Sequence, residues 1–162
     1  MTIKLEYTPD IGIKINSTTI NWFTNRETVR NLLGQPSEQQ DRVIDLGENL
    51  KVESRRDIYK NIYAGDNYIF LNYNTDNALT ELEVHWGVDI TVKDIKLDFN
   101  SNIQDNITAL TKLTDNFKEI ETGNFLFPTL KLTIADHESL GGDGHELGYF
   151  YASTDISHLL EE

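Results

Sequence analysis

Residues 11–33 read IGIKINSTTINWFTNRETVRNLL, and this stretch decides the predicted fold. It begins with alternating apolar and polar residues, which is typical of a half-buried strand. A second short strand follows, and then Val29, Leu32 and Leu33 lie at the spacing of one helix face. Residues 90–113, ITVKDIKLDFNSNIQDNITALTKL, repeat this order roughly 78 residues later, close to half the chain. This weak internal repeat predicts a duplicated unit made of two strands and a helix.

The first predicted helix has well-marked ends. Thr24 or Asn25 is suited to cap its start, and Glu27 lies in its first turn, where a carboxylate complements the helix dipole. Gly34 ends the helix, and Pro36 prevents its return. Working outward from this helix, we expect an antiparallel meander after each copy of the unit.

The meander is predicted from alternation and turn residues. Its strands are expected at 57–63, 68–73, 79–86, 117–121, 125–127, 130–134 and 149–152. Between 37 and 56 only Val43 to Leu46 is strand-like. We therefore predict an α+β fold, in which tandem helix-plus-antiparallel-sheet repeats form one mostly antiparallel sheet with helices on one face. Residues 1–162 form one domain, with pseudo-repeats at about 1–86 and 87–162.

Composition narrows the classes of partner. The chain has 14 basic and 27 acidic residues, a net charge of −13, and no cysteine. This charge repels phosphate, so nucleic acid and anionic membranes are not expected as partners, whereas a basic protein is favoured. The absence of cysteine excludes disulfides and thiolate chemistry. The first residues lack the pattern of a secretory signal, so we expect a cytoplasmic protein.

The glycine-rich loop at 141–146 is the first candidate for chemistry. It has no lysine and is followed by a strand, so it does not fit a phosphate site. His137 and His145 have acidic neighbours but lack the fixed spacing of a metal site. No Gly-x-Ser-x-Gly motif marks a nucleophile. We expect no metal, cofactor or enzymatic activity; an enzyme or metal protein centred on 136–146 remains an alternative.

One face of the predicted sheet carries interleaved aromatic and acidic side chains. If Ile69 and Leu71 face the core, their neighbours on the strand face the other side. On 79–86, Leu82, Val84 and Trp86 are predicted to point inward. Such a mixture is typical of a protein-binding surface with apolar anchors and a charged rim. The predicted partner-binding residues are Tyr68, Phe70, Glu81, Glu83, His85, Asp143, Tyr149 and Tyr151.

Two segments resemble known proteins. Residues 20–36, INWFTNRETVRNLLGQP, resemble the strand and Leu-Gly-x-Pro helix end of beta-lactamase-inhibitory-protein-like repeats. Residues 125–132, FLFPTLKL, are similar to the strand after the second helix in small bacterial immunity-type proteins of that shape. The resemblance implies a tandem repeat fold, no catalysis, and inhibition of a partner through the sheet surface. The lack of cysteines departs from the secreted inhibitor and favours a cytoplasmic target over a beta-lactamase.

These observations lead to one main hypothesis. The chain is predicted to be an immunity protein that occludes the active site of a basic toxin, as a monomer or homodimer. The alternative is a structural or regulatory module that self-associates through the same face. A protein that forms a dimer without any partner would favour this alternative.

Overall fold

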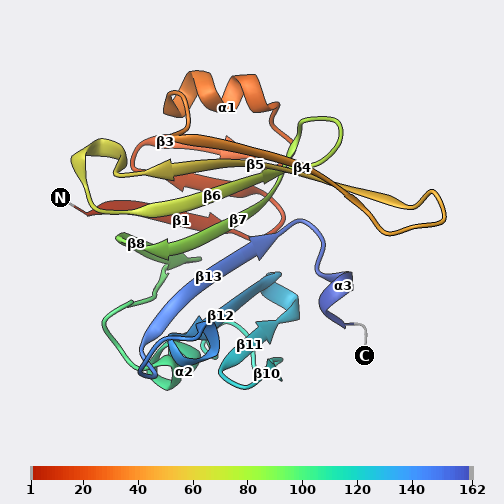
Figure 1. Cartoon of the computed structure of the whole chain (residues 1–162). Helices are drawn as coiled ribbons and strands as arrows, with labels where there is room; N and C mark the ends of the chain where they lie inside the picture. Colours follow the sequence, from red (N-terminus) through yellow and green to blue (C-terminus); the bar gives the residue numbers. More distant parts are fainter. Residues whose placement is uncertain (1, 161–162) are drawn as a thin grey trace.

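The structure, a computed structural model, describes residues 2–160. Two β-sheets pack against each other, and short helices lie around them (Figure 1). The described part of the chain contains thirteen strands but only three α-helices, two of them eight residues long. The predicted α+β fold with one sheet is therefore wrong, and the chain is mostly β.

The smaller sheet has five strands in the order β3-β2-β1-β8-β9. Its central pair, β1 and β8, is parallel, and its other pairs are antiparallel. Its strands are β1 (Ile3–Thr8), β2 (Gly12–Ile15), β3 (Thr18–Asn21), β8 (Val88–Val92) and β9 (Ile95–Lys96). These strands come from both predicted repeats, which the single-sheet prediction did not anticipate.

The larger sheet has eight antiparallel strands in the order β10-β11-β12-β13-β7-β6-β5-β4. Its first four-strand meander is β4 (Glu38–Asp45), β5 (Lys51–Lys60), β6 (Tyr68–Tyr73) and β7 (Leu79–Trp86). Its second is β10 (Lys118–Glu121), β11 (Asn124–Phe127), β12 (Leu132–Asp136) and β13 (Leu147–Ser153). The two meanders join where β7 pairs with β13.

The helices are α1 (Arg26–Leu33), α2 (Ile103–Leu110) and α3 (Ser157–Leu160), with 3-10 turns at Ile62–Ala64, Pro128–Leu130 and Glu138–Leu140. Asn25 caps α1, because its side chain accepts a hydrogen bond from the Glu27 amide. Asn102 caps α2 in the same way. Both halves of the chain thus run through a hairpin, a capped helix and four strands. The division into pseudo-repeats 1–86 and 87–162 stays a prediction.

The hydrophobic core lies between the two sheets. Leu5 and Ile15 of the small sheet are fully buried in the same apolar cluster as Leu71, Leu82 and Phe150 of the large sheet. The Tyr7 hydroxyl also donates to the Leu130 carbonyl across the interface, at 2.7 Å. The apolar face of the large sheet is thus covered by a second sheet. Helices of eight residues are too short to cover it, which is why the predicted helical layer is absent from residues 2–160.

Helix α1 is held by charge as well as by apolar packing. Its buried residues are Arg26 and Val29, whereas Leu32 of the predicted apolar stripe is 48% exposed. Arg26 donates to the fully buried Asp57 carboxylate at 2.6 Å, and Arg30 donates to the same oxygen at 2.7 Å. This ion-pair network anchors α1 to β5, and it replaces part of the apolar contact that periodicity predicts.

Candidate functional site

Strand alternation places most of the predicted binding residues on one surface. We call this surface the outer face: the side of the large sheet that is turned away from the small sheet. On β6, β7 and β13, the residues that alternate with the outer-face residues point the other way, into the core. The outer face carries Tyr68, Phe70, Glu81, Glu83, His85, Tyr149 and Tyr151.

The sheet register brings these residues into contact. Strand β7 lies between β6 and β13, and Glu83 is opposite Phe70 on one side and Tyr151 on the other. The outer-face residues of β6 and β7 therefore lie beside Tyr149 and Tyr151 of β13, although these strands are far apart in the sequence. Asp143 does not join them. It is exposed in the turn before β13 and makes no side-chain hydrogen bond or ion pair within residues 2–160.

The two outer-face glutamates form a fixed hydrogen-bond network. Glu83 accepts from Arg56 and from Asn72, both at 2.8 Å, and from the Tyr149 hydroxyl at 2.6 Å. The Tyr151 hydroxyl donates to Glu81. Burial, and then the nearby Glu83 carboxylate, raise the pKa of Tyr149 well above its usual value, so this hydroxyl stays a donor. Glu83 is thereby held by three donors.

A groove of about 310 Å³ opens over this network. Its floor includes Arg56, Asn72, Glu81 and Glu83, and residues of α3 form one wall. Under α3, a small apolar cluster of Leu126, Tyr151 and Ile156 holds the helix on the sheet. The carboxamide oxygen of Asn124, also in the groove, is buried and accepts no hydrogen bond from residues 2–160. The acceptors that the groove presents to a ligand are therefore the carboxylates of Glu81 and Glu83, because the Asn124 oxygen is enclosed.

Aromatic side chains border one end of the outer face. Tyr68 stacks on Trp86 with ring centroids 4.7 Å apart, and Phe70 lies 4.5 Å from His85. The Arg56 guanidinium lies over the Phe70 ring at 4.5 Å. Trp86 is 47% exposed, so this cluster presents apolar surface to solvent. Burial lowers the pKa of His85, against the opposing effect of Glu83, and keeps the imidazole neutral at neutral pH.

Trp86 itself was predicted to point into the core, and this is wrong. The ladder between β6 and β7 has an irregularity: Tyr68 is opposite Trp86, but Ile69 is opposite Val84. His85 is thus an extra residue on β7, and the bulge turns Trp86 out of the alternating pattern. A strict period of two cannot detect such an insertion.

The sequence also missed several polar members of the site. Asn72 follows the predicted Tyr68 and Phe70 on the same side of β6 but was not named, Arg56 lies on β5, and Asn124 and α3 come from distant parts of the chain. Alternation along 68–73 could have placed Asn72 beside Phe70. Arg56 lies in a segment without a clear strand pattern, so no local signal places its side chain on this face.

The loop between β12 and β13 provides a second arrangement of titratable groups. His145 Nδ1 lies 3.0 Å from the Asp136 carboxylate, and its Nε2 lies 3.2 Å from Glu138. The hydrogen bond with Asp136, and then the charge of Glu138, raise the pKa of His145. Both ring nitrogens are occupied by carboxylates. Residues 2–160 contain no group of three or more side chains arranged to bind a metal ion.

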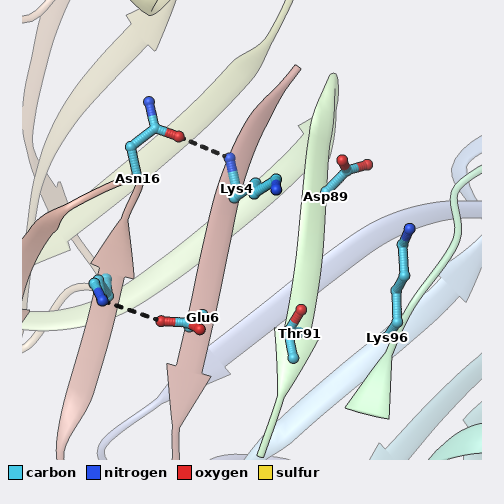
Figure 2. Close-up of a pocket in the computed structure, with 7 residues that line it drawn as sticks. Lys4, Glu6, Asn16, Asp89, Thr91 and Lys96 are labelled. Carbon is cyan, nitrogen blue, oxygen red and sulfur yellow. Dashed lines mark hydrogen bonds and ion pairs between the residues drawn. The ribbon is translucent and has the colours of Figure 1, made fainter. Parts of the chain in front are cut away.

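A larger hollow of about 450 Å³ lies on the exposed face of the small sheet (Figure 2). Lys4, Glu6, Asp89 and Lys96 line it, and Lys14 is 3.8 Å from Glu6. Figure 2 shows these side chains spread along neighbouring strands. Interspersed charges of both signs are usual on a solvated sheet face, so the outer face is the stronger candidate site.

Within residues 2–160, none of the helices is long and apolar enough to cross a lipid bilayer. Comparison with protein-family models, with curated proteins and with solved structures finds no match to this chain. The resemblance to inhibitory and immunity-type proteins therefore stays a prediction.

Proposed function

We propose that this chain is a non-catalytic protein that binds and inhibits a basic partner protein through the outer face. The observation that supports this best is the combination found there: a hydrogen-bonded carboxylate–tyrosine groove beside an aromatic cluster that exposes Trp86. Protein interfaces commonly combine aromatic anchors with polar groups already held in place. An immunity protein that covers the active site of a toxin is the function we propose.

The groove is suited to a lysine or arginine side chain of the partner. Its two carboxylates, Glu81 and Glu83, exceed the single guanidinium of Arg56, so its local charge is negative. Glu83 accepts from three donors, whereas Glu81 accepts from two, the Tyr151 hydroxyl and the Asn72 side chain, so Glu81 has more acceptor capacity left. A cationic donor entering the groove gains charge-assisted hydrogen bonds there.

The charge of the whole chain acts at longer range. At −13, the protein attracts a basic partner and speeds their encounter, and added salt weakens this attraction. The outer face itself has charges of both signs. We therefore attribute the long-range attraction to the net charge of the whole molecule, and only the specific contacts to the outer face.

The test captures partners from a lysate of the source cells with tagged protein, at low and at high salt. Glu81→Lys reverses the available groove charge, and Glu6→Lys makes the same change on the exposed face of the small sheet. We expect the wild type and Glu6→Lys to retain one basic protein, with binding that is weaker at high salt. Glu81→Lys is expected to lose this protein. Equal retention by both variants, or a bait that only forms its own dimer, would contradict the proposal.

A further inference from the structure

The hairpin of β4 and β5 extends beyond the large sheet. Strand β6 pairs with β5 only from Arg55 to Lys60. Residues 51–54 of β5 pair with β4 alone, so residues 42–54 form a two-stranded arm. Figure 1 shows this arm projecting away from the body of the molecule, at the right of the view.

The arm concentrates exposed apolar side chains. Ile44 and Val52 are cross-strand partners, and Leu46 and Leu50 follow them at the turn. These four side chains are between 45% and 58% exposed. A two-stranded ribbon has no core in which to bury them. Single exposed apolar residues are ordinary, but a group of them on one element marks an interaction surface.

The turn holds this group in a defined shape. The Leu46 amide donates to the Leu50 carbonyl at 2.8 Å, and the Leu50 amide donates to the Gly47 carbonyl at 2.8 Å. The Asp45 side chain accepts from the Gly47 amide at 2.9 Å. A turn fixed before binding loses little conformational entropy when it docks.

The arm continues the outer face. Along β5, Val52 alternates onto the same side as Ser54 and Arg56, and Arg56 lies in the groove. Ile44, opposite Val52, shares that side. One partner that covers the groove therefore meets the apolar side of the arm at the edge of the same surface.

We propose that the arm inserts its four apolar side chains into an apolar cleft with a basic rim on the same partner protein. Residues 42–54 contain three acidic and two basic residues, so the arm is slightly acidic. A second copy of this chain also carries −13 and is repelled, which favours a basic partner as the occupant. This inference rests on the proposed function, since the partner is the one that the outer face binds.

The first experiment places a photo-reactive benzoyl-phenylalanine at position 46 in one sample and at position 68 in another. Each protein is irradiated in a lysate of the source cells, and the cross-linked protein is identified by mass spectrometry. We expect both positions to capture the same basic protein. Capture at 68 alone, or of a second copy at 46, would overturn the role of the arm but not that of the outer face. Capture at neither position would contradict both.

The second experiment measures the affinity of the captured, purified protein. Leu46→Ser with Leu50→Ser removes apolar surface from the turn, and Leu32→Ser with Leu140→Ser makes matched changes at leucines that are 48% and 50% exposed elsewhere. We expect the arm variant to weaken binding about tenfold or more and the control to leave it unchanged. Equal affinities for the two variants would refute the arm contact. Circular dichroism checks that each variant stays folded.

Discussion

Single residues fix the two features on which the rest depends, the anchored helix and the polar groove. Arg26 and Arg30 share the buried carboxylate of Asp57, and Glu83 accepts three hydrogen bonds under the groove. Burial opposes the charge of Arg26, but hydrogen bonds with Asp57 and Asp41 outweigh it and raise its pKa. Removing one partner from such a network leaves buried charges unpaired.

Asp57→Ala is expected to be among the most damaging single substitutions. It leaves Arg26 and Arg30 without their shared partner, and we expect it to lower the free energy of unfolding by about 3–5 kcal/mol. Chemical denaturation measures this change. Asp76→Ala, at an exposed turn, is the control and should have little effect. A loss for Asp57→Ala below about 1 kcal/mol would show that α1 does not depend on this network.

The pKa values of two histidines are expected to be shifted in opposite directions from the ordinary value of 6.5. Burial lowers the pKa of His85, so its contribution to stability is complete above pH 6.5 and is lost as the pH falls below it. The bond with Asp136 raises the pKa of His145, so its contribution is complete below pH 6.5 and is lost as the pH rises through the raised pKa. NMR titration of the imidazoles tests both. Asp136→Asn should return the pKa of His145 toward 6.5. An unchanged His145 pKa in this variant would contradict the hydrogen bond with Asp136 as the cause of the shift.

At the scale of elements, the site depends on the bulge in β7 and on the turn that follows it. Gly87 has φ of 79°, and a Cβ there would lie 1.8 Å from the Asp66 carbonyl oxygen. Gly141 has φ of 89°, but its Cβ would meet no atom within 4 Å. Both glycines adopt the left-handed region, yet only Gly87 is also closely packed against backbone.

Gly87→Ala is therefore expected to cost more stability than Gly141→Ala. The second substitution has only the backbone conformation to overcome, about 1–2 kcal/mol, whereas the first must also move the backbone of residue 66. Because Asp66 accepts a hydrogen bond from Trp86, we also expect Gly87→Ala to change the fluorescence of that tryptophan. Thermal unfolding of the two variants makes the comparison. Equal losses would mean that the contact with residue 66 is relieved without cost.

The elements that the sequence predicts correctly are those with a strong local signal. The cap at Asn25, the end of α1 at Gly34, and the strands expected at 68–73 and 149–152 are confirmed. Strands β4 and β5 were largely missed because half of their length is a solvent-exposed ribbon, where no buried face imposes a pattern. Arg56 was missed with them. The parallel pairing of β1 with β8 joins distant segments and leaves no trace in local periodicity.

At the scale of the whole molecule, the core lies between two sheets and leaves one broad sheet surface turned outward. The predicted binding residues were brought together there by alternation and register, except Asp143. The layer that covers the inner side could not be predicted, because the same alternating strands are compatible with a helical or a β layer. The predicted residues can therefore lie on one surface even though the predicted architecture is wrong.

The central claim is that the outer face contacts the partner, and oxidative footprinting of the free and bound protein tests it most directly. Trp86 and Phe117 are both exposed, at 47% and 38%, but Phe117 stacks on Phe127 of the core between the sheets and not on the outer-face aromatic cluster. With the captured basic protein bound, we predict that Trp86 and Tyr68 become protected from oxidation while Phe117 is oxidised as before. Protection of Phe117 with Trp86 and Tyr68 unchanged would contradict the account.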